Sequence, residues 1–161
     1  VILNLYDEDA FNLAADKMKT DVAAYDAKAV SEFFLIEAMS PNPLAELIIN
    51  LRQDPQFGAA LVLGSGGVLV ELLADTVTLL LPTRPVEIIR ALKSLRVGPL
   101  LEGFRGGQAV DITKVAEEIY KLCITFQEHM KTIVEIEINP LFVYREKVSA
   151  IDALVQVPAD K

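Results

Sequence analysis

The chain has 161 residues, of which 52% are hydrophobic, so it can fold around a sizeable core and is not a disordered segment. Its formal net charge of −8 argues against nucleic acid and against a membrane surface as partners, because both attract basic patches. One cysteine cannot build a disulfide framework, and no stretch is long and apolar enough to span a bilayer, so we expect a cytoplasmic protein.

The N-terminal stretch predicts a strand followed by a helix. Residues 1–5 form a short apolar run that is typical of a strand. Asp7 is placed to cap a helix in which Phe11, Ala14 and Met18 recur on one face. Residues 20–28 are polar and rich in alanine, and we expect them to form a connection.

Two further strands are predicted around a proline-rich turn. Residues 33–36 are continuously apolar and read as a buried strand that ends at residues 37–39, Glu-Ala-Met. Ser-Pro-Asn-Pro at 40–43 has turn chemistry, and residues 44–51 read as the next strand, with Glu46 near its start. Periodicity alone favours a plain hairpin, with a methionine in the core and a glutamate on the surface.

A glycine-rich loop follows the strand predicted at residues 57–63. Glycines at 64–67 (Gly-Ser-Gly-Gly) let a backbone approach a phosphate closely. The loop has neither the dinucleotide fingerprint nor the P-loop pattern, so a tight turn between strands is the default interpretation. Glu71 ends the next apolar run, where it could tune a metal site or serve only to solvate the end of a strand.

The middle of the chain predicts a strand at 76–81 and then a helix that Thr83 caps. This helix carries the one short basic cluster of the sequence, which is either a solvated face or an attraction for an anionic partner: Arg90, Lys93 and Arg96. Gly-Pro at 98–99 is expected to break the helix.

The next loop and helix contain several polar candidates. Arg105 lies in a glycine-rich loop, where its fork of donors could contact phosphate or carboxylate. Asp111 is expected to cap a long amphipathic helix, in which Cys123 is a buried core thiol rather than a nucleophile. His129 is the only histidine and reads as a surface residue near the end of that helix, so no catalytic triad can be assembled.

The strongest local pattern is the one-for-one alternation of apolar and polar residues at 134–139. It predicts a strand with Glu135, Glu137 and Asn139 on one face, and residues 148–154 read as the strand that folds back. A hairpin would place Asp152 close to both, giving two carboxylates and an amide oxygen, the ligands that Mg²⁺ prefers. The alternative is an edge hairpin with a solvated polar face.

The order of these elements mixes helices with adjacent strands and lacks regular β-α-β alternation. We therefore predict the α+β class, with an antiparallel-rich sheet on which helices pack.

The hairpin sequence Glu137-Ile138-Asn139-Pro140-Leu141 with Asp152 resembles the ATP-grasp subunit of succinyl-CoA synthetase. It resembles still more closely the ATP-grasp domain of the NDP-forming acyl-CoA (acetyl-CoA) synthetases. The same family has matching blocks at residues 54–58 (Asp-Pro-Gln-Phe-Gly), 64–71 and 101–106, so the resemblance covers nearly the whole chain.

The resemblance implies a set of site residues, and each falls on a position of this sequence. The metal ligands fall on Asn139 and Asp152, with Glu137 as the acidic position before them. The adenine hinge falls on Glu37, Ala38 and Met39, and the ribose contact on Glu46. Catalytic positions at the nucleotide cleft fall on Glu71 and Arg105.

The resemblance also implies a function. Residues 1–161 would be one domain, the C-terminal portion of an ATP-grasp domain with its upstream part missing. It would bind ATP and Mg²⁺ within a ligase that joins a carboxylic acid to CoA, together with a CoA-binding domain or subunit, and would be inactive alone. Two alternatives stay open: a non-catalytic nucleotide-sensing or regulatory module, as fused to protein acetyltransferases, and a structural interaction domain that binds no nucleotide.

Overall fold

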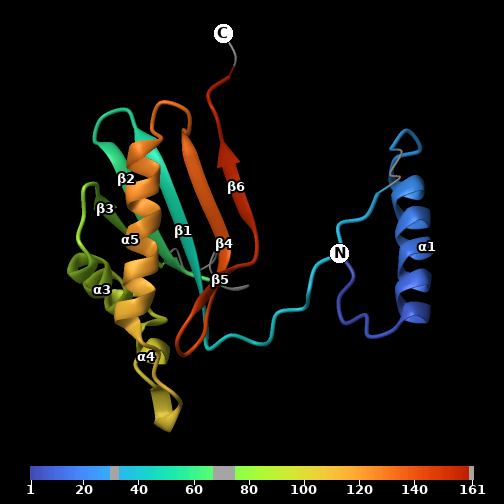
Figure 1. Ribbon diagram of the computed structural model, residues 1–161, viewed down its shortest axis with the longest axis horizontal. Coiled ribbons are helices and arrows are strands. Elements are labelled where there is room, and N and C mark those ends of the chain that lie inside the picture. The colour runs from blue at the N-terminus through green and yellow to red at the C-terminus, as the bar shows by residue number, and fades with distance from the viewer. Residues whose placement is uncertain (30–32, 67–74, 160–161) are drawn as a thin grey trace. The chain divides into compact units, whose positions relative to one another are not determined.

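The computed structural model describes residues 1–29, 33–66 and 75–159, which form two compact units (Figure 1). Unit 1 is Val1–Asn42 and unit 2 is Pro43–Lys161. The prediction that residues 1–161 make up one domain stays a prediction.

Unit 1 is built around one long helix, α1 (Glu8–Tyr25). The predicted cap is confirmed, because the Asp7 carboxylate accepts a hydrogen bond from the Ala10 N–H at 2.7 Å. The connection expected at 20–28 is wrong, since the helix continues to Tyr25. Alanines favour helix strongly, and Lys17 pairs with Asp21 one turn later at 2.6 Å, so the polar residues lie on the exposed side of the helix.

The strands expected at residues 1–5 and 33–36 are also wrong, because both segments are extended coil in their described parts. A strand requires a neighbour for its backbone groups, and the described residues of unit 1 contain no β-ladder. The second run is not buried either: Phe33 is 85% exposed and Leu35 is 86% exposed.

Unit 2 contains an antiparallel sheet, which confirms the α+β class. Its described strands are β1 (Ala45–Asp54), β2 (Gly58–Ser65), β3 (Thr76–Leu80), β4 (Glu135–Val143), β5 (Val148–Ala150) and β6 (Ala153–Gln156). The strand order is β3-β2-β1-β4-β5, and β6 also pairs with β4, so β1 and β4 are central. The return strand expected at 148–154 is thus two short strands, β5 and β6, separated by residues 151–152.

Helices α3 (Pro85–Ser94) and α5 (Ile112–Glu128) lie on one face of this sheet (Figure 1). Alternate residues of the central strands are buried beneath them and form the core with apolar residues of both helices, among them Leu47, Ile49, Leu51, Ile88, Leu92, Ile119 and Phe126. Asp111 caps α5 by accepting from the Lys114 N–H at 3.2 Å, as predicted. Burial raises the pKa of the Cys123 thiol to about 12, which fits an inert core residue.

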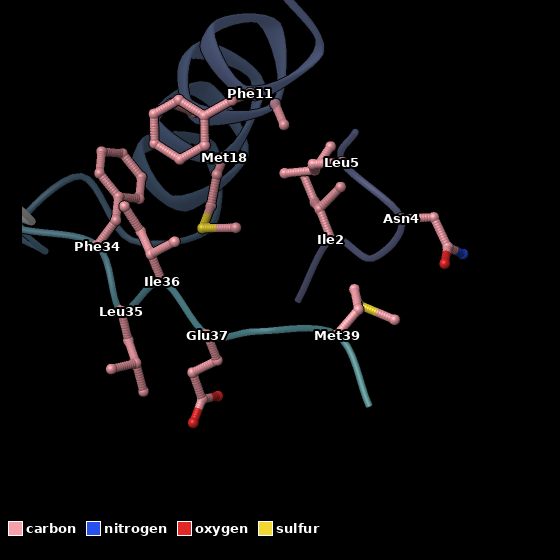
Figure 2. Close-up of a pocket in the computed structure, with 12 residues that line it drawn as sticks. Ile2, Asn4, Leu5, Phe11, Met18, Phe34, Leu35, Ile36, Glu37 and Met39 are labelled. Atoms are coloured by element: carbon pink, nitrogen blue, oxygen red, sulfur yellow. The ribbon is translucent and has the colours of Figure 1, made fainter. Parts of the chain in front are cut away.

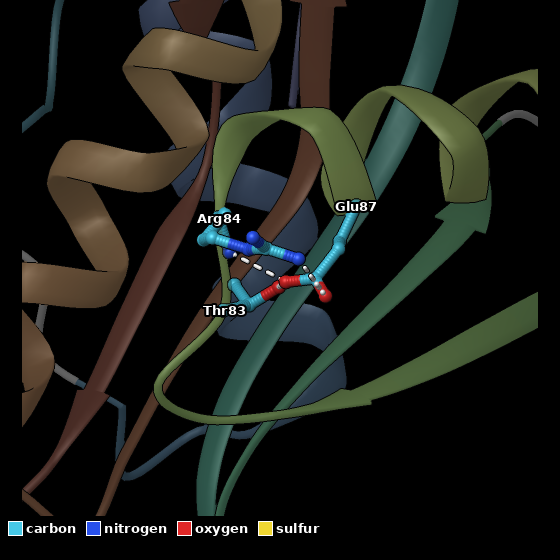
Figure 3. A network of polar contacts seen from close by, with 3 residues as sticks. All are labelled: Thr83, Arg84 and Glu87. Atoms are coloured by element: carbon cyan, nitrogen blue, oxygen red, sulfur yellow. Dashed lines mark hydrogen bonds and ion pairs between the residues drawn. The ribbon is translucent and has the colours of Figure 1, made fainter.

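The start of α3 is fixed by a small polar network (Figure 3). The Glu87 carboxylate accepts from the Arg84 backbone N–H at 2.9 Å and from the Thr83 hydroxyl at 3.1 Å, and it pairs with the Arg84 guanidinium at 3.2 Å. Arg84, and not the expected Thr83, is therefore the N-cap residue. The Arg84 hydrogen bonds lower the pKa of Glu87.

Helix α3 ends at Ser94, and Gly-Pro at 98–99 begins the short helix α4 (Gly98–Leu101).

The opposite face of the sheet carries a row of polar side chains, which we call the open face. On β1 it includes Glu46 and Asn50, and on β4 it includes Glu135 and Glu137, all of them half-buried. They alternate with the fully buried residues of the core face, as the period of two in a strand requires. The sheet thus separates an apolar core from a face on which these polar side chains stand beside apolar ones, among them Ile48 and Leu154.

The glycine-rich loop approaches β1 as closely as two backbones can. The Gly66 N–H donates to the Glu46 carbonyl oxygen at 2.6 Å, and a Cβ atom on Gly66 would lie 2.6 Å from the Glu46 carbonyl carbon. This N–H is therefore used within the protein. A glycine is needed at position 66 because a side chain there would collide with the backbone of β1. This packing role is compatible with the default interpretation of the loop as a tight turn.

We expect Gly66→Ala to destabilise unit 2 by about 1–3 kcal/mol, because backbone cannot move aside as a flexible side chain can. Gly64→Ala is the matched control, since its nearest contact is the Thr76 methyl group at 3.2 Å and a smaller loss is expected. Urea denaturation measures both changes. Equal losses for the two variants would contradict this account of the contact.

Candidate functional site

The predicted hairpin brings Asn139 and Asp152 together. The Asn139 N–H donates to the Asp152 carbonyl oxygen at 3.1 Å, and next to it the Ile151 N–H donates to the Pro140 carbonyl oxygen at 3.0 Å. Both candidate ligands are exposed, so their side-chain oxygens can reach a ligand from solvent. The hairpin geometry is confirmed, and the metal role of these residues stays a prediction.

A bulge in β4 sets the position of Asn139. The pairing of β1 with β4 changes from Ile49 opposite Ile138 to Leu47 opposite Leu141, so two residues of β4 face one residue of β1. Strict alternation is interrupted at this point. Glu137 precedes the bulge, lies opposite Asn50 on β1 and Leu154 on β6, and is half-buried on the open face.

The donor set fits a hard cation with few protein ligands. No group of three or more His, Cys, Asp or Glu side chains is placed to hold a metal among the residues that the structure describes. Glu137, Asn139 and Asp152 instead offer two carboxylates and an amide oxygen. Mg²⁺ is commonly held by one or two carboxylates and completed by substrate phosphates and water, so this set is chemically suitable.

Two of the three predicted adenine residues lie at an apolar pocket inside unit 1. The cavity has a volume of about 180 Å³, and both Glu37 and Met39 line it. Figure 2 shows Phe34 and Ile36 turned toward the helix side chains, whereas Glu37 points away from them. The apolar lining with a few polar groups is typical of a small-molecule site, but the volume is below the roughly 300–1,000 Å³ of most ligand pockets.

The other predicted residues are placed differently. Ala38 is exposed and does not line this pocket, and Glu46 lies on β1 in unit 2, opposite Phe142 of β4. Glu71 lies outside the described residues. None of these three assignments is tested by the structure, so each stays a prediction.

Arg105 lies in a short 3-10 turn, η1 (Phe104–Gly106), at the tip of a loop. Its backbone is left-handed, with φ of 53°, and it follows Gly103, which has φ of 91°. The guanidinium lies 5.2 Å from the centre of the Phe104 ring, and no ion pair to it is found in the described part of the chain. An exposed, unpaired guanidinium remains available to an anion.

Sequence reasoning placed Glu135 on the same strand face as Glu137, but it missed Asn50 and the contact between Asn50 and Glu135. The Asn50 side-chain amide donates to Glu135 Oε1 at 2.5 Å, across 85 residues of sequence. Glu135 is part of the alternating stretch that signals β4, but nothing local identifies its partner. The pairing depends on the register between β1 and β4, which a single sequence does not reveal.

The one histidine of the chain is a surface residue at the end of α5. His129 is exposed, as predicted, and its Nδ1 atom lies 2.8 Å from the Thr125 carbonyl oxygen at the end of α5. No helix among the described residues is long and apolar enough to cross a membrane.

Comparison with known proteins identifies the family. The model of the ATP-grasp domain matches residues 1–157, and the chain therefore belongs to the ATP-grasp family. It is 35% identical over 160 residues to a trans-feruloyl-CoA synthase from an unknown prokaryotic organism, covering 98% of this chain and 22% of that protein. It is 28% identical to the beta subunit of an ADP-forming acetate–CoA ligase II from Pyrococcus furiosus, covering 94% of this chain and 64% of the subunit.

Solved structures agree with this assignment. A dinucleotide-forming acetyl-coenzyme A synthetase 1 of Ca. Korarchaeum cryptofilum, in complex with coenzyme A, Ca-AMPCP and HgCl⁺, matches with a TM-score of 0.86 at 29% identity, over 98% of this chain and 68% of that chain. The same enzyme with coenzyme A and Mg-AMPPCP matches with a TM-score of 0.79 at 27% identity, over 98% and 67%. The predicted resemblance to NDP-forming acyl-CoA synthetases is confirmed.

Proposed function

We propose that this chain is the ATP- and Mg²⁺-binding part of an ADP-forming acid–CoA ligase. The overall reaction converts a carboxylic acid, CoA and ATP into the acyl-CoA thioester, ADP and phosphate. The observation that carries the proposal is the hairpin that sets exposed Asn139 against exposed Asp152 on the strand bearing Glu137. The relatives support it, because those named above are CoA ligases or synthases.

In this proposal the residues of the two units have separate tasks. Asn139, Asp152 and Glu137 would hold Mg²⁺, which when bound neutralises phosphate charge during phosphoryl transfer. Glu37 and Met39 would line the seat of the nucleobase, where an apolar pocket suits a planar ring. Arg105 would offer its bidentate donors to a phosphate or carboxylate.

We expect the chain alone to bind ATP weakly and only with Mg²⁺, and to form no CoA thioester. Its net charge of −8 opposes the phosphates, and a charge-assisted hydrogen bond contributes only about 1.5–3 kcal/mol, so the cation decides whether binding occurs. Equilibrium binding of a fluorescent ATP analogue, with Mg²⁺ and then with a chelator, measures the first expectation. Thioester formation from CoA and a panel of short acids measures the second.

These measurements also separate the alternatives. Nucleotide binding that is tight without metal would contradict the proposed role of the hairpin. Mg²⁺-dependent binding that persists in the complete protein without any thioester formation would favour a nucleotide-sensing module. Absence of nucleotide binding under every condition would favour a structural interaction domain.

A further inference from the structure

Asn50 makes a hydrogen bond that runs diagonally across the open face. In the register of β1 and β4, Asn50 lies opposite Glu137, and Arg52 lies opposite Glu135. The Asn50 amide nevertheless donates to the Glu135 Oε1 atom at 2.5 Å. The Glu135 carboxylate therefore lies toward the cross-strand pair of Asn50 and Glu137. Diagonal neighbours on one face of a sheet are within reach of side chains of this length.

The chemistry of the contact fixes the orientation of the amide. An ionised carboxylate only accepts hydrogen bonds, so the Asn50 Nδ2 atom must face Glu135 and the Oδ1 atom must face away. That Oδ1 atom is buried and has no hydrogen-bond partner among the described residues. In the described part of the chain, Glu135 is therefore the side-chain partner of Asn50 on this face.

Arg52 is the competing partner for the same carboxylate. It lies directly opposite Glu135 and is exposed, but in the described part of the chain no ion pair joins the two side chains. An ion pair with an exposed guanidinium is weakened by solvent, whereas the Asn50 hydrogen bond is partly buried and keeps its strength.

We propose that Asn50 is a positioning residue, which holds the Glu135 carboxylate away from Arg52 and beside Glu137 so that the charge of both carboxylates acts on a cation at the hairpin. This inference rests on the proposed function. Glu135 itself is not required to touch the cation. Its carboxylate lies two residues from Glu137 on the same strand face, and a negative charge there attracts a cation through space. A charge near a site changes the affinity of that site for a cation without being a ligand.

We expect Asn50→Ala to weaken Mg²⁺ binding in the presence of ATP by roughly two- to fivefold, because Glu135 is then free to pair with Arg52 and its charge acts less on the cation. Adding Arg52→Ala should restore most of the lost affinity, since no competing cation remains. A merely structural role of Asn50 would not produce this rescue. Isothermal titration of the full chain with Mg²⁺ at fixed ATP measures all three proteins, and Thr78→Ala, on β3 of the same sheet, is the control that should bind like the unaltered chain.

A second readout requires no metal. Hydrogen exchange of the Asn50 side-chain amide, followed by NMR, should be slower than that of exposed Asn12 and should become fast in Glu135→Ala. If the unaltered chain binds no Mg²⁺ with ATP, the proposed function is wrong and the inference falls with it. Three results would overturn the inference alone, provided that the unaltered chain binds Mg²⁺. The first is equal Mg²⁺ affinity in Asn50→Ala, and the second is no recovery of affinity when Arg52→Ala is added. The third is free exchange of the Asn50 side-chain amide in the unaltered chain.

Discussion

Replacement of both Asn139 and Asp152 by alanine is expected to remove Mg²⁺-dependent ATP binding while the fold persists. Loss of two charge-assisted contacts costs about 3 kcal/mol or more, which is on the order of a hundredfold or more in affinity. The hairpin itself should survive, because the bond between the two residues is made by backbone atoms, Asn139 N–H to Asp152 carbonyl, at 3.1 Å. Titration calorimetry with Mg·ATP measures the affinity, and far-UV circular dichroism checks the fold.

The control for this variant is a matched pair of substitutions elsewhere. Gln56→Ala and Glu117→Ala together also remove one amide and one carboxylate from exposed positions, on the turn after β1 and on α5. The change in net charge is therefore the same as in the test variant. Mg·ATP affinity that is unchanged in the Asn139 and Asp152 variant, or reduced equally in the control, would exclude the hairpin as the metal site.

The parts of the fold that the sequence predicted are those controlled by local physics. Alternation at 134–139 gave β4 because strand side chains point to opposite faces, and Asp7 and Asp111 identified helix starts because carboxylates satisfy free N–H groups there. The wrong predictions of the fold also have physical causes. Residues 33–36 are as apolar as a buried strand but have no partner strand, and composition does not reveal whether a partner exists.

The candidate site was predictable to the extent that it is contained in one hairpin. Asn139 and Asp152 are close in sequence, so a turn between two strand patterns was enough to bring them together. Asn50 and Glu135 are separated by 85 residues and meet only because β1 and β4 pair in one particular register. A slip of one residue would move Asn50 to the core face, which is why such contacts require a structure.

The largest expected loss of stability comes from Phe126→Ala in the core that supports the open face. Phe126 is fully buried on α5 and belongs to the core, on the sheet face opposite Glu137. Truncation of a buried phenylalanine costs about 3–5 kcal/mol, through lost burial and a cavity, which is a large share of the 5–15 kcal/mol typical of a domain. We expect the urea midpoint to fall accordingly. Phe57→Ala is the control, because Phe57 is 68% exposed and its removal should change stability by no more than about 0.5 kcal/mol.

Cys123 provides an independent measure of the same loss. It lies one turn before Phe126 on the buried face of α5, and burial raises the pKa of its thiol to about 12, so in the folded state it is both covered and protonated. Because the thiolate is the reactive form, labelling at neutral pH requires the unit to open. Phe126→Ala should therefore accelerate labelling of Cys123 by on the order of a hundredfold or more, in proportion to the open population. Labelling that stays as slow as in Phe57→Ala would show that Phe126 does not hold α5 on the sheet.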